Sequence, residues 1–462
     1  MNQKFDGRYM NSSSTNVGKM GYLSAVSIGI GGMVGGGIFA VLGLSVKFAH
    51  GGTPIAFLLA GIIALITSYS YTKLSITYPS QGGTVEFLNQ AFGGGLFTGG
   101  MNILLWLSYI VMLSLYSFAF GSYGASLFPG AHEIWKHILI SGSIILFTML
   151  NISGAKFVGE AEEYIVAIKL IILLLFIVIG FNSINFQRVA PVEWSGSLEL
   201  IAGGMIIFLA YEGFELIANT AGNVKDAKKN LPKAYYSSVG FVIILYVLVA
   251  LVTVGNLPVI KIIAAKDYAL AEAAKPFMGN FGFTLIAIAA ILSTGSAINA
   301  TLYGAARVSY VIAKDGELPA VLENKIWKKP IEGLLITALF TLLVSNFFNL
   351  DGISTMGSAG FLIIFASVNA ANMKMNRKTN SKKWISLIGI IFCLAAFILM
   401  IIQTLRTSPN NIWILVIMFG SAFLLEGIYR EFRGKRKLQT QIKSDTASYV
   451  TKNSPDFKQN NK

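Results

Sequence analysis

Three groups of residues in this chain have types and spacing that could perform chemistry inside a lipid bilayer. One is a run of six glycines within nine positions, namely Gly29, Gly31, Gly32, Gly35, Gly36 and Gly37. Another is the polar sequence Tyr-Glu-Gly-Phe-Glu at residues 211–215, and the third is Lys169, alone in an apolar stretch. Unpaired backbone and ionisable side chains are costly in hydrocarbon, so where they occur they indicate functional sites.

The glycine run predicts unwound chain at the centre of a membrane span. Gly35, Gly36 and Gly37 are consecutive and cover every face of a helix, whereas close helix packing needs small residues on one face. Unwound backbone at membrane depth survives only where it lines a cavity. Its free N–H groups and the adjoining helix N-terminus would then receive an anionic group. Close packing of helices is the alternative interpretation.

The two interruptions lie in corresponding places of the two halves of the chain. The glycine run falls in the apolar stretch 22–46 and the polar sequence in the stretch 198–221. Such a pair is the best sequence indication of the binding site of a secondary transporter. The sequence therefore predicts a membrane carrier whose site is built from both broken helices.

Lys169 has two interpretations. It lies six residues past Glu163, about 9 Å deeper along a helix, and a nearly all-apolar run follows it. A lysine near the bilayer centre costs about 2.5–3.5 kcal/mol on insertion scales. Its side chain either snorkels toward the interface or carries a proton, since burial penalises its charged form and brings proton exchange into a working range.

Glu212 and Glu215 are three residues apart and would share one face of a regular helix, but the interruption removes that guarantee. For Glu215, a structural or gating role and direct substrate contact are both open. For Glu212, three roles are open: carrying protons, selecting cationic side chains, or pairing with a lysine. Glu86 is open between a gate contact with Arg307 and a solvated carboxylate.

The elements that must position these residues are apolar stretches along nearly the whole chain. The composition is 54% hydrophobic and 13% charged, against about 25% charged for a soluble domain. Each stretch is long enough to cross a hydrocarbon core of about 30 Å. We place twelve spans, at 22–46, 54–78, 97–126, 134–154, 160–181, 198–221, 236–255, 280–306, 332–348, 353–373, 384–404 and 411–429.

Charge distribution predicts the orientation. With both termini cytoplasmic, the cytoplasmic segments hold 28 of the 36 Lys and Arg, the external loops hold seven, and Lys169 is the remaining one. This excess follows the positive-inside rule and indicates a multi-pass protein of the cell membrane. It also accounts for the net charge of +14 without a nucleic-acid partner.

Several features of enzymes, pumps and metal sites are missing. There is no G-x-x-x-x-G-K-[ST] string, and the three histidines (His50, His132 and His137) fall in predicted external loops or at their edge. The G-x-G-x-x-A string at residues 35–40 has no βαβ context. Cys393 is the single cysteine and excludes an intrachain disulfide. We expect no enzyme activity and no metal or organic cofactor.

Four sequence strings together resemble the amino acid–polyamine–organocation (APC) transporters over essentially the full length. They are Gly-Met-Val-Gly-Gly-Gly-Ile-Phe at 32–39, Pro-Ser-Gln-Gly-Gly at 79–83, the segment 223–232, and Lys-Asp-Gly-Glu-Leu-Pro at 314–319. Ala227 stands where the family pattern has a proline. Within the family, the run 168–173 most resembles the ApcT-type sodium-independent, proton-coupled amino acid transporters.

The resemblance implies an all-α polytopic membrane protein with the LeuT-like fold and 12 transmembrane helices. Its domains would be a cytoplasmic segment (1–21), two inverted five-helix repeats (22–181 and 182–375), two peripheral helices (376–431) and a disordered cytoplasmic tail (432–462).

The resemblance also implies roles for individual residues. The substrate carboxylate would lie near Gly36 and Gly37, the ammonium near carbonyls around Met33, Leu209 and Glu212, and Phe208 or Tyr211 would cover the substrate. The substrate-binding set is Met33, Gly35, Gly36, Gly37, Ile38, Phe208, Leu209, Tyr211, Glu212 and Gly213. Lys169 would take the place of a coupling cation, facing Ser293 and Thr294, whose hydroxyls fit ordinary polar packing equally well.

The expected function is uptake of amino acids, mainly a broad range of neutral L-amino acids, by alternating access with a proton as the coupling ion. Partners would be the amino acid and the lipid bilayer, with a monomer or weak homodimer as the assembly. The alternatives are an exchanger of cationic amino acids or polyamines, and a sensor of the same fold that binds without transporting.

Overall fold

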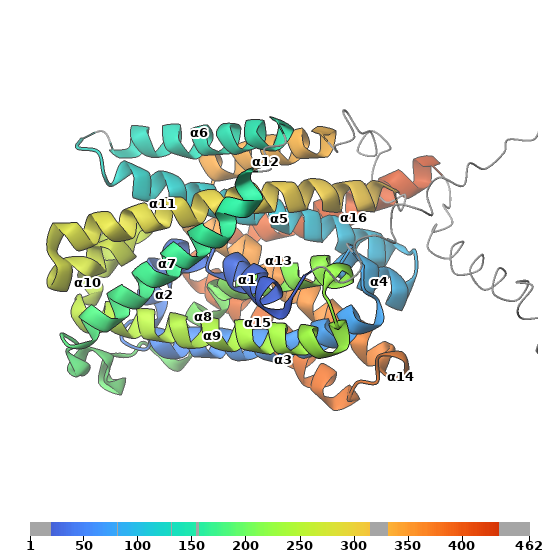
Figure 1. The fold of residues 1–462 in the computed structure, drawn as a ribbon, viewed down its shortest axis with the longest axis horizontal. Coiled ribbons are helices and arrows are strands. Elements are labelled where there is room, and N and C mark those ends of the chain that lie inside the picture. Colours follow the sequence, from blue (N-terminus) through green and yellow to red (C-terminus); the bar gives the residue numbers. More distant parts are fainter. Residues whose placement is uncertain (1–19, 81, 131, 154–156, 315–330, 434–462) are drawn as a thin grey trace, which may run out of the picture.

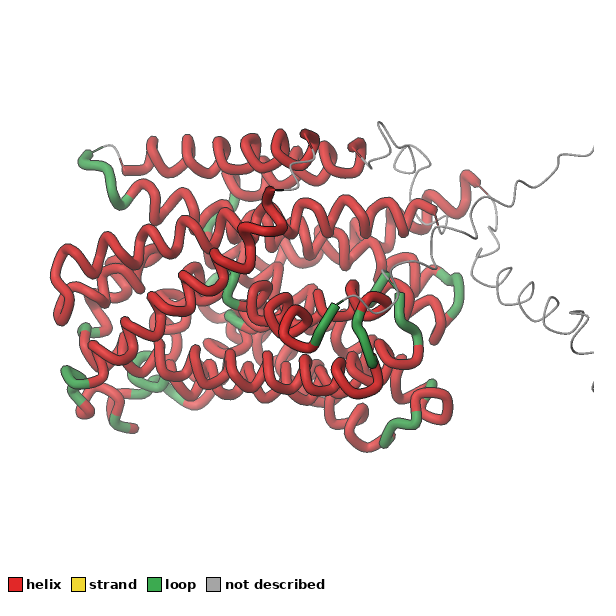
Figure 2. The backbone as a smooth tube through the Cα atoms, in the orientation of Figure 1, coloured by secondary structure: helices red, strands yellow, loops and turns green. Residues whose placement is uncertain are grey.

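The computed structural model describes residues 20–433 except 81, 131, 154–156 and 315–330. Within these residues the regular structure is helical, and the only β pairing is two isolated bridges, Met20 with Val224 and His50 with Trp194 (Figure 2). Most of the predicted N-terminal segment, most of the tail and the string at 315–319 lie outside the described residues.

The helices run beside one another as a bundle (Figure 1). The first part of the chain forms α1 (Tyr22–Met33), α2 (Gly37–Ala49), α3 (Thr53–Thr77), α4 (Thr84–Phe92), α5 (Leu96–Ala125), α6 (His132–Ser153), α7 (Phe157–Phe181), η2 (Phe186–Val189) and η3 (Pro191–Glu193). The second part forms α8 (Ser197–Ile206), η4 (Phe208–Asn223), α9 (Ala227–Asn256), α10 (Val259–Ala265), η5 (Lys266–Tyr268), α11 (Ala269–Lys314), α12 (Ile331–Phe347), α13 (Leu350–Lys374), α14 (Asn376–Thr379), α15 (Lys383–Thr407) and α16 (Asn410–Arg433).

The apolar spans are present as helices. Within the described residues, ten helices or helix pairs are long and apolar enough to cross a membrane, and α1 with α2 makes an eleventh that bends by 43°. Each of the twelve predicted stretches coincides with a helix or a broken pair, but α12, with 17 residues, is shorter than the other spans. The protein is therefore a polytopic helical membrane protein, and the count of twelve stays a prediction.

Burial separates the central helices from the outer ones. Nearly all side chains of α5 and α13 are buried, whereas α15 and α16 expose many large apolar side chains. Helices with apolar side chains on their outer face fit a lipid environment, because lipid tails are as apolar as leucine side chains. The broken elements α1, α2, α8 and η4 lie inside this frame, between α3, α5, α9, α11 and α13.

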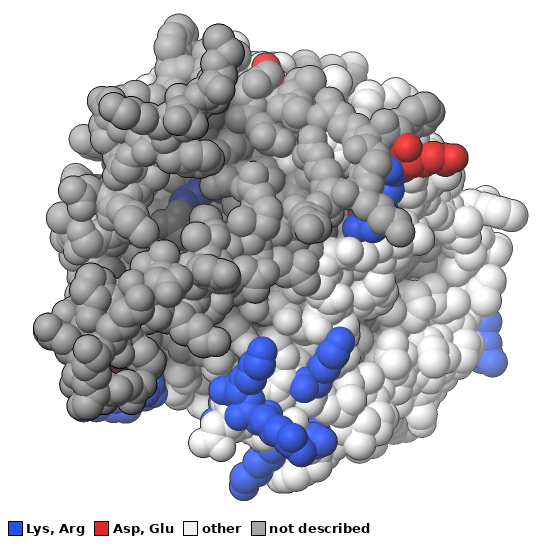
Figure 3. Space-filling view, turned by 90° about the vertical axis from the view of Figure 1, so that its right-hand side faces the viewer, with Lys and Arg blue, Asp and Glu red and all other residues white. Residues whose placement is uncertain are grey.

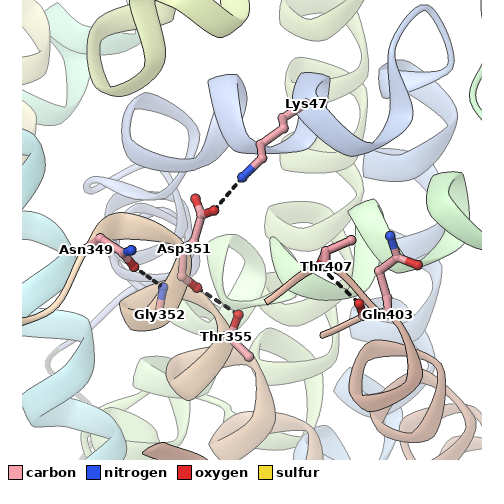
Figure 4. Close-up of polar contacts among 7 residues, drawn as sticks. All are labelled: Lys47, Asn349, Asp351, Gly352, Thr355, Gln403 and Thr407. Atoms are coloured by element: carbon pink, nitrogen blue, oxygen red, sulfur yellow. Dashed lines mark hydrogen bonds and ion pairs between the residues drawn. The ribbon is translucent and has the colours of Figure 1, made fainter. Parts of the chain in front are cut away.

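Two ion pairs join separate elements at the end of the bundle where α13 begins. Lys47, near the end of α2, lies 2.5 Å from the Asp351 carboxylate in the first turn of α13 (Figure 4). Lys136 of α6 lies 3.6 Å from Asp267 of η5 and over the ring of Phe118. The pair of Lys47 and Asp351 is partly exposed, and exposed pairs contribute at most about 1 kcal/mol. The Lys136 side chain is 11% exposed, so desolvation offsets more of its attraction for Asp267.

The positive-inside assignment predicts which end of the bundle faces the cytoplasm. A reporter fused after Lys383 or at the C-terminus should be cytoplasmic, and one inserted beside Asp267 should be external, because the basic loops stay inside. Reporter activity and protease protection in intact cells measure this. An external C-terminus would show that the orientation is wrong.

Candidate functional site

The first helix break lies where the glycine run predicted it. α1 ends at Met33, and α2 begins at Gly37 after a turn in which Gly36 has φ −149° and ψ −16°. No side chain caps the start of α2. Its first N–H groups have no acceptor within the helix, so they carry the partial positive charge of the helix N-terminus into the gap.

The second break begins earlier than the polar sequence predicted. α8 ends at Ile206 and the chain continues from Phe208 as the 3₁₀-helix η4, so residues 211–215 are wound tightly rather than unwound. The regular partner of the Ile206 carbonyl would be the Ala210 N–H, which instead bonds Ile207 O at 2.9 Å. A 3₁₀ stretch of 16 residues is far longer than usual, and such stretches inside helices often mark hinges.

Serines of α13 explain where the second break begins. Ser354 and Ser358 each donate a hydroxyl hydrogen bond to Ile206 O at 2.7 Å. The Leu209 N–H donates to the Ser358 hydroxyl at 3.2 Å. These side chains replace the helical hydrogen bonds that are lost at the break, so α13 fixes its position.

The carbonyl groups freed at the first break are paired by side chains from three other helices. Lys169 Nζ donates to Gly31 O at 3.2 Å, from a side chain that is 1% exposed. The Ser293 hydroxyl lies 2.7 Å from Val34 O and 2.5 Å from Gly35 O. Lys169 and Ser293 therefore meet the same short segment, as the resemblance implied. Thr294 does not take part, because its hydroxyl donates to Ala290 O of its own helix.

Tyr246 of α9 joins the two breaks. Its hydroxyl donates to Met33 O at 2.6 Å, lies 3.3 Å from Ala210 O, and accepts from the Ile38 N–H. The helices also touch directly, since a side chain at Gly213 would overlap the backbone of Gly32. The predicted contact between the two broken helices is present.

The glycines of the first break differ in what surrounds them. A Cβ at Gly32 would lie 2.8 Å from Gly213 O, and one at Gly37 would lie 2.7 Å from Ala210 Cα, so these two permit close approach of backbones. A Cβ at Gly36 would instead meet the ring of Tyr116. Gly36 therefore lies at the face of the break that a side chain of α5 covers.

An aromatic residue that the sequence did not single out lies against the first break, and the covering role of Phe208 or Tyr211 stays a prediction. Phe208 packs against Phe365 with ring centres 5.8 Å apart, and Tyr211 donates its hydroxyl to Phe57 O at 2.9 Å. The ring against Gly36 belongs to Tyr116, which is one of many aromatic residues in apolar spans and carries no distinguishing sequence signal.

Glu215 joins four elements. Its carboxylate accepts hydrogen bonds from Tyr109 at 2.5 Å, Tyr71 at 3.0 Å and Thr84 at 3.2 Å, which come from α5, α3 and α4. The side chain is 1% exposed. A buried carboxylate with three donors is well satisfied, so the structure gives Glu215 a cross-linking position.

Glu212 lies next to Glu215 rather than next to a lysine. Their carboxyl groups are hydrogen-bonded to each other, and the phenols of Tyr116 and Tyr109 are their neighbours. Ionised carboxylates only accept hydrogen bonds, so one of the two acids must carry a proton. This observation opposes the pairing with a lysine that the sequence left open.

The proposed gate residues make other contacts. Glu86 accepts from Gln90 Nε2 at 2.8 Å, and Arg307 lies over the ring of Tyr303. The contact between Glu86 and Arg307 stays a prediction.

Comparison with known proteins identifies the family. The sequence model described as "Amino acid permease" matches residues 20–423, which is most of the chain. The chain belongs to the amino acid permease family. This permease is 38% identical to an uncharacterised protein of Methanocaldococcus jannaschii over 89% of its own length and 95% of the relative's. It is 32% identical to the inner membrane transport protein YbaT of Escherichia coli, with 84% and 91% covered.

A more distant relative carries a substrate name. The branched-chain amino acid permease BcaP of Bacillus subtilis is 24% identical, with 78% of the permease and 81% of that relative covered. The named relatives are transporters rather than enzymes. The described part of the permease holds no group of three or more His, Cys, Asp or Glu arranged for a metal ion.

Gly36→Ala should weaken amino acid binding at least about tenfold, because the added methyl meets the Tyr116 ring and narrows the break. Binding of radiolabelled amino acids to the purified protein measures this. Gly142→Ala is the matched control, since nothing lies within 4 Å of the position its Cβ would take. Equal affinity in both well-folded variants would mean that Gly36 only packs.

Proposed function

We propose that this permease is a secondary active transporter that takes up neutral L-amino acids by alternating access. The observation that carries the proposal is the meeting of two helix breaks inside the bundle. α1 and α8 end there with carbonyl groups, while α2 and η4 begin there with N–H groups. Opposite partial charges placed side by side suit the carboxylate and ammonium of a zwitterion.

The proposed preference for neutral substrates is based on the contacts that the acidic side chains near the breaks already make. Glu212 is occupied by Glu215, so it offers no free carboxylate to a cationic side chain. The charged side chain of a cationic substrate would need an ionised partner once it is buried. Because Glu212 does not offer one, this arrangement supports neutral over cationic substrates.

Lys169 is the proposed proton carrier. Its Nζ donates a hydrogen bond to Gly31 O, beside the Val34 and Gly35 carbonyls that accept from Ser293. A positive charge at this place stabilises the first break in its present conformation. Loss of the proton removes the charge from beside those carbonyls. A proton shifts the balance of two states only by its differential affinity for them, so the proposal requires that the two orientations hold the Lys169 proton differently.

Proton coupling predicts that uptake into proteoliposomes rises as external pH falls and does not require sodium. Lys169→Ala should lose the pH dependence and the response to an inward proton gradient, while amino acid binding persists. Lys275→Ala is the matched control, because that lysine is 40% exposed and pairs with Glu272 on its own helix. Glu212→Gln keeps a donor for Glu215 and should retain the pH dependence.

Two results would contradict this assignment. Gradient-driven, pH-dependent uptake by Lys169→Ala would move the coupling site elsewhere, with Glu212 next to be tested. A strict sodium requirement of the unmodified protein would exclude proton coupling. Binding without any uptake would favour a sensor of the same fold.

A further inference from the structure

The connection between α13 and α15 concentrates positive charge at one end of the bundle. Five basic residues fall within ten positions and all are exposed, namely Lys374, Arg377, Lys378, Lys382 and Lys383. No acidic residue lies among them. We call these five residues the α14 patch. Figure 3 views this end of the bundle and shows blue side chains gathered on its lower half, with no red side chain visible among them.

The sequence after the patch marks the level of the membrane surface. Trp384 follows directly and is 59% exposed. Leu387, Ile391 and Leu394 are also exposed and follow at helical spacing, so they form an apolar stripe along α15. Tryptophan favours the interface between headgroups and hydrocarbon. The α14 patch therefore lies at headgroup level, just outside the apolar stripe.

Buried polar contacts hold the patch in one position. Asn372 Nδ2 donates to the Ser386 hydroxyl at 2.9 Å, and the Thr379 hydroxyl donates to Asn372 Oδ1 at 2.9 Å. These contacts join the last turn of α13, α14 and the first turn of α15. Side chains on such a fixed support form a better-defined site than charges on a free loop.

The same connection is attached to α3. Lys73 Nζ donates to Asn380 O at 2.9 Å, and the Lys382 N–H donates to the Tyr69 hydroxyl at 2.7 Å. Asn380 has a φ of 47°, in the left-handed region that asparagine tolerates better than most residues, so the chain turns sharply here. A ligand on the α14 patch would thus contact the connection that links α3, α13 and α15.

We propose that the α14 patch binds the phosphate groups of anionic lipids in the leaflet that this end of the bundle faces. A cluster of four to eight Lys and Arg beside a transmembrane helix is the usual composition of such a site. Arg377 adds a guanidinium that can hold two phosphate oxygens at once. The bound headgroup bridges α14 and the start of α15 and holds both against α3.

Lipid binding by matched variants tests the proposal. One variant combines Arg377→Gln, Lys378→Gln, Lys382→Gln and Lys383→Gln. The control combines Lys225→Gln, Lys228→Gln, Lys229→Gln and Lys233→Gln, which removes the same four charges from exposed positions at and just before the start of α9. Retention of phosphatidylglycerol and phosphatidylcholine by the purified full-length protein is measured by native mass spectrometry, together with its melting temperature in each lipid.

The unmodified protein should retain phosphatidylglycerol over phosphatidylcholine and melt at a higher temperature in it. The α14 variant should lose this preference at least about tenfold, since each charge near an anionic surface is worth about fivefold in affinity. The control should keep most of it. If the fourfold variant does not fold, Arg377→Gln with Lys378→Gln should give a smaller loss in the same direction.

Three outcomes would overturn the proposal. Equal losses in the α14 variant and the α9 control would show a diffuse effect of net charge. Equal stabilisation by glycerol 3-phosphate and by phosphatidylglycerol would show a soluble anion site instead of a lipid site. An unchanged preference in the α14 variant would show that the patch does not bind lipid.

Discussion

The structure depends on pairing the backbone groups that two broken helices expose within hydrocarbon. Water is absent there, so each such group needs a partner from the protein. Lys169 meets Gly31 O, Tyr246 meets Met33 O, and Ser293 meets Val34 O. Serines of α13 meet the end of α8. The partners come from α7, α9, α11 and α13, which surround the breaks.

The same contacts suit a site that must change shape. An unpaired buried carbonyl costs about 1–3 kcal/mol, which is small enough for a bound amino acid or a moving proton to compensate. The partners are single hydroxyl and ammonium groups rather than a continuous hydrogen-bond ladder. Glu215 differs, because its three donors come from three elements and are satisfied together. The elements around Glu215 are therefore firmly cross-linked, whereas the helix breaks are held by individual hydrogen bonds.

The sequence predicted the features that have a local cause. Consecutive glycines at 35–37 mark the first break, because no regular transmembrane helix needs three in a row, and apolar length marks the spans. Features with a distant cause were missed or misplaced. The second break begins at Ile207 because Ser354 and Ser358, about 150 residues later, take the hydrogen bonds at that point.

The sequence was also a poor guide to which side chains lie next to one another. Tyr116 covers Gly36 from another helix, and the Glu212–Glu215 hydrogen bond forms among buried phenols of other helices. The Tyr116 contact leaves no pattern along the chain, whereas the spacing of the two acids allowed their contact without requiring it. Lys169 was different, since a single cation in an apolar span already requires a partner, and the structure supplies the Gly31 carbonyl.

The central claim is that the two breaks together bind an amino acid. An experimental structure of the full-length permease in lipid with a bound neutral L-amino acid tests it most directly. We predict ligand density at the face of the first break that Tyr116 covers, with the carboxylate within hydrogen-bond distance of the Gly36 or Gly37 N–H groups. Density at another place in the bundle, with both breaks filled only by protein side chains, would contradict the account.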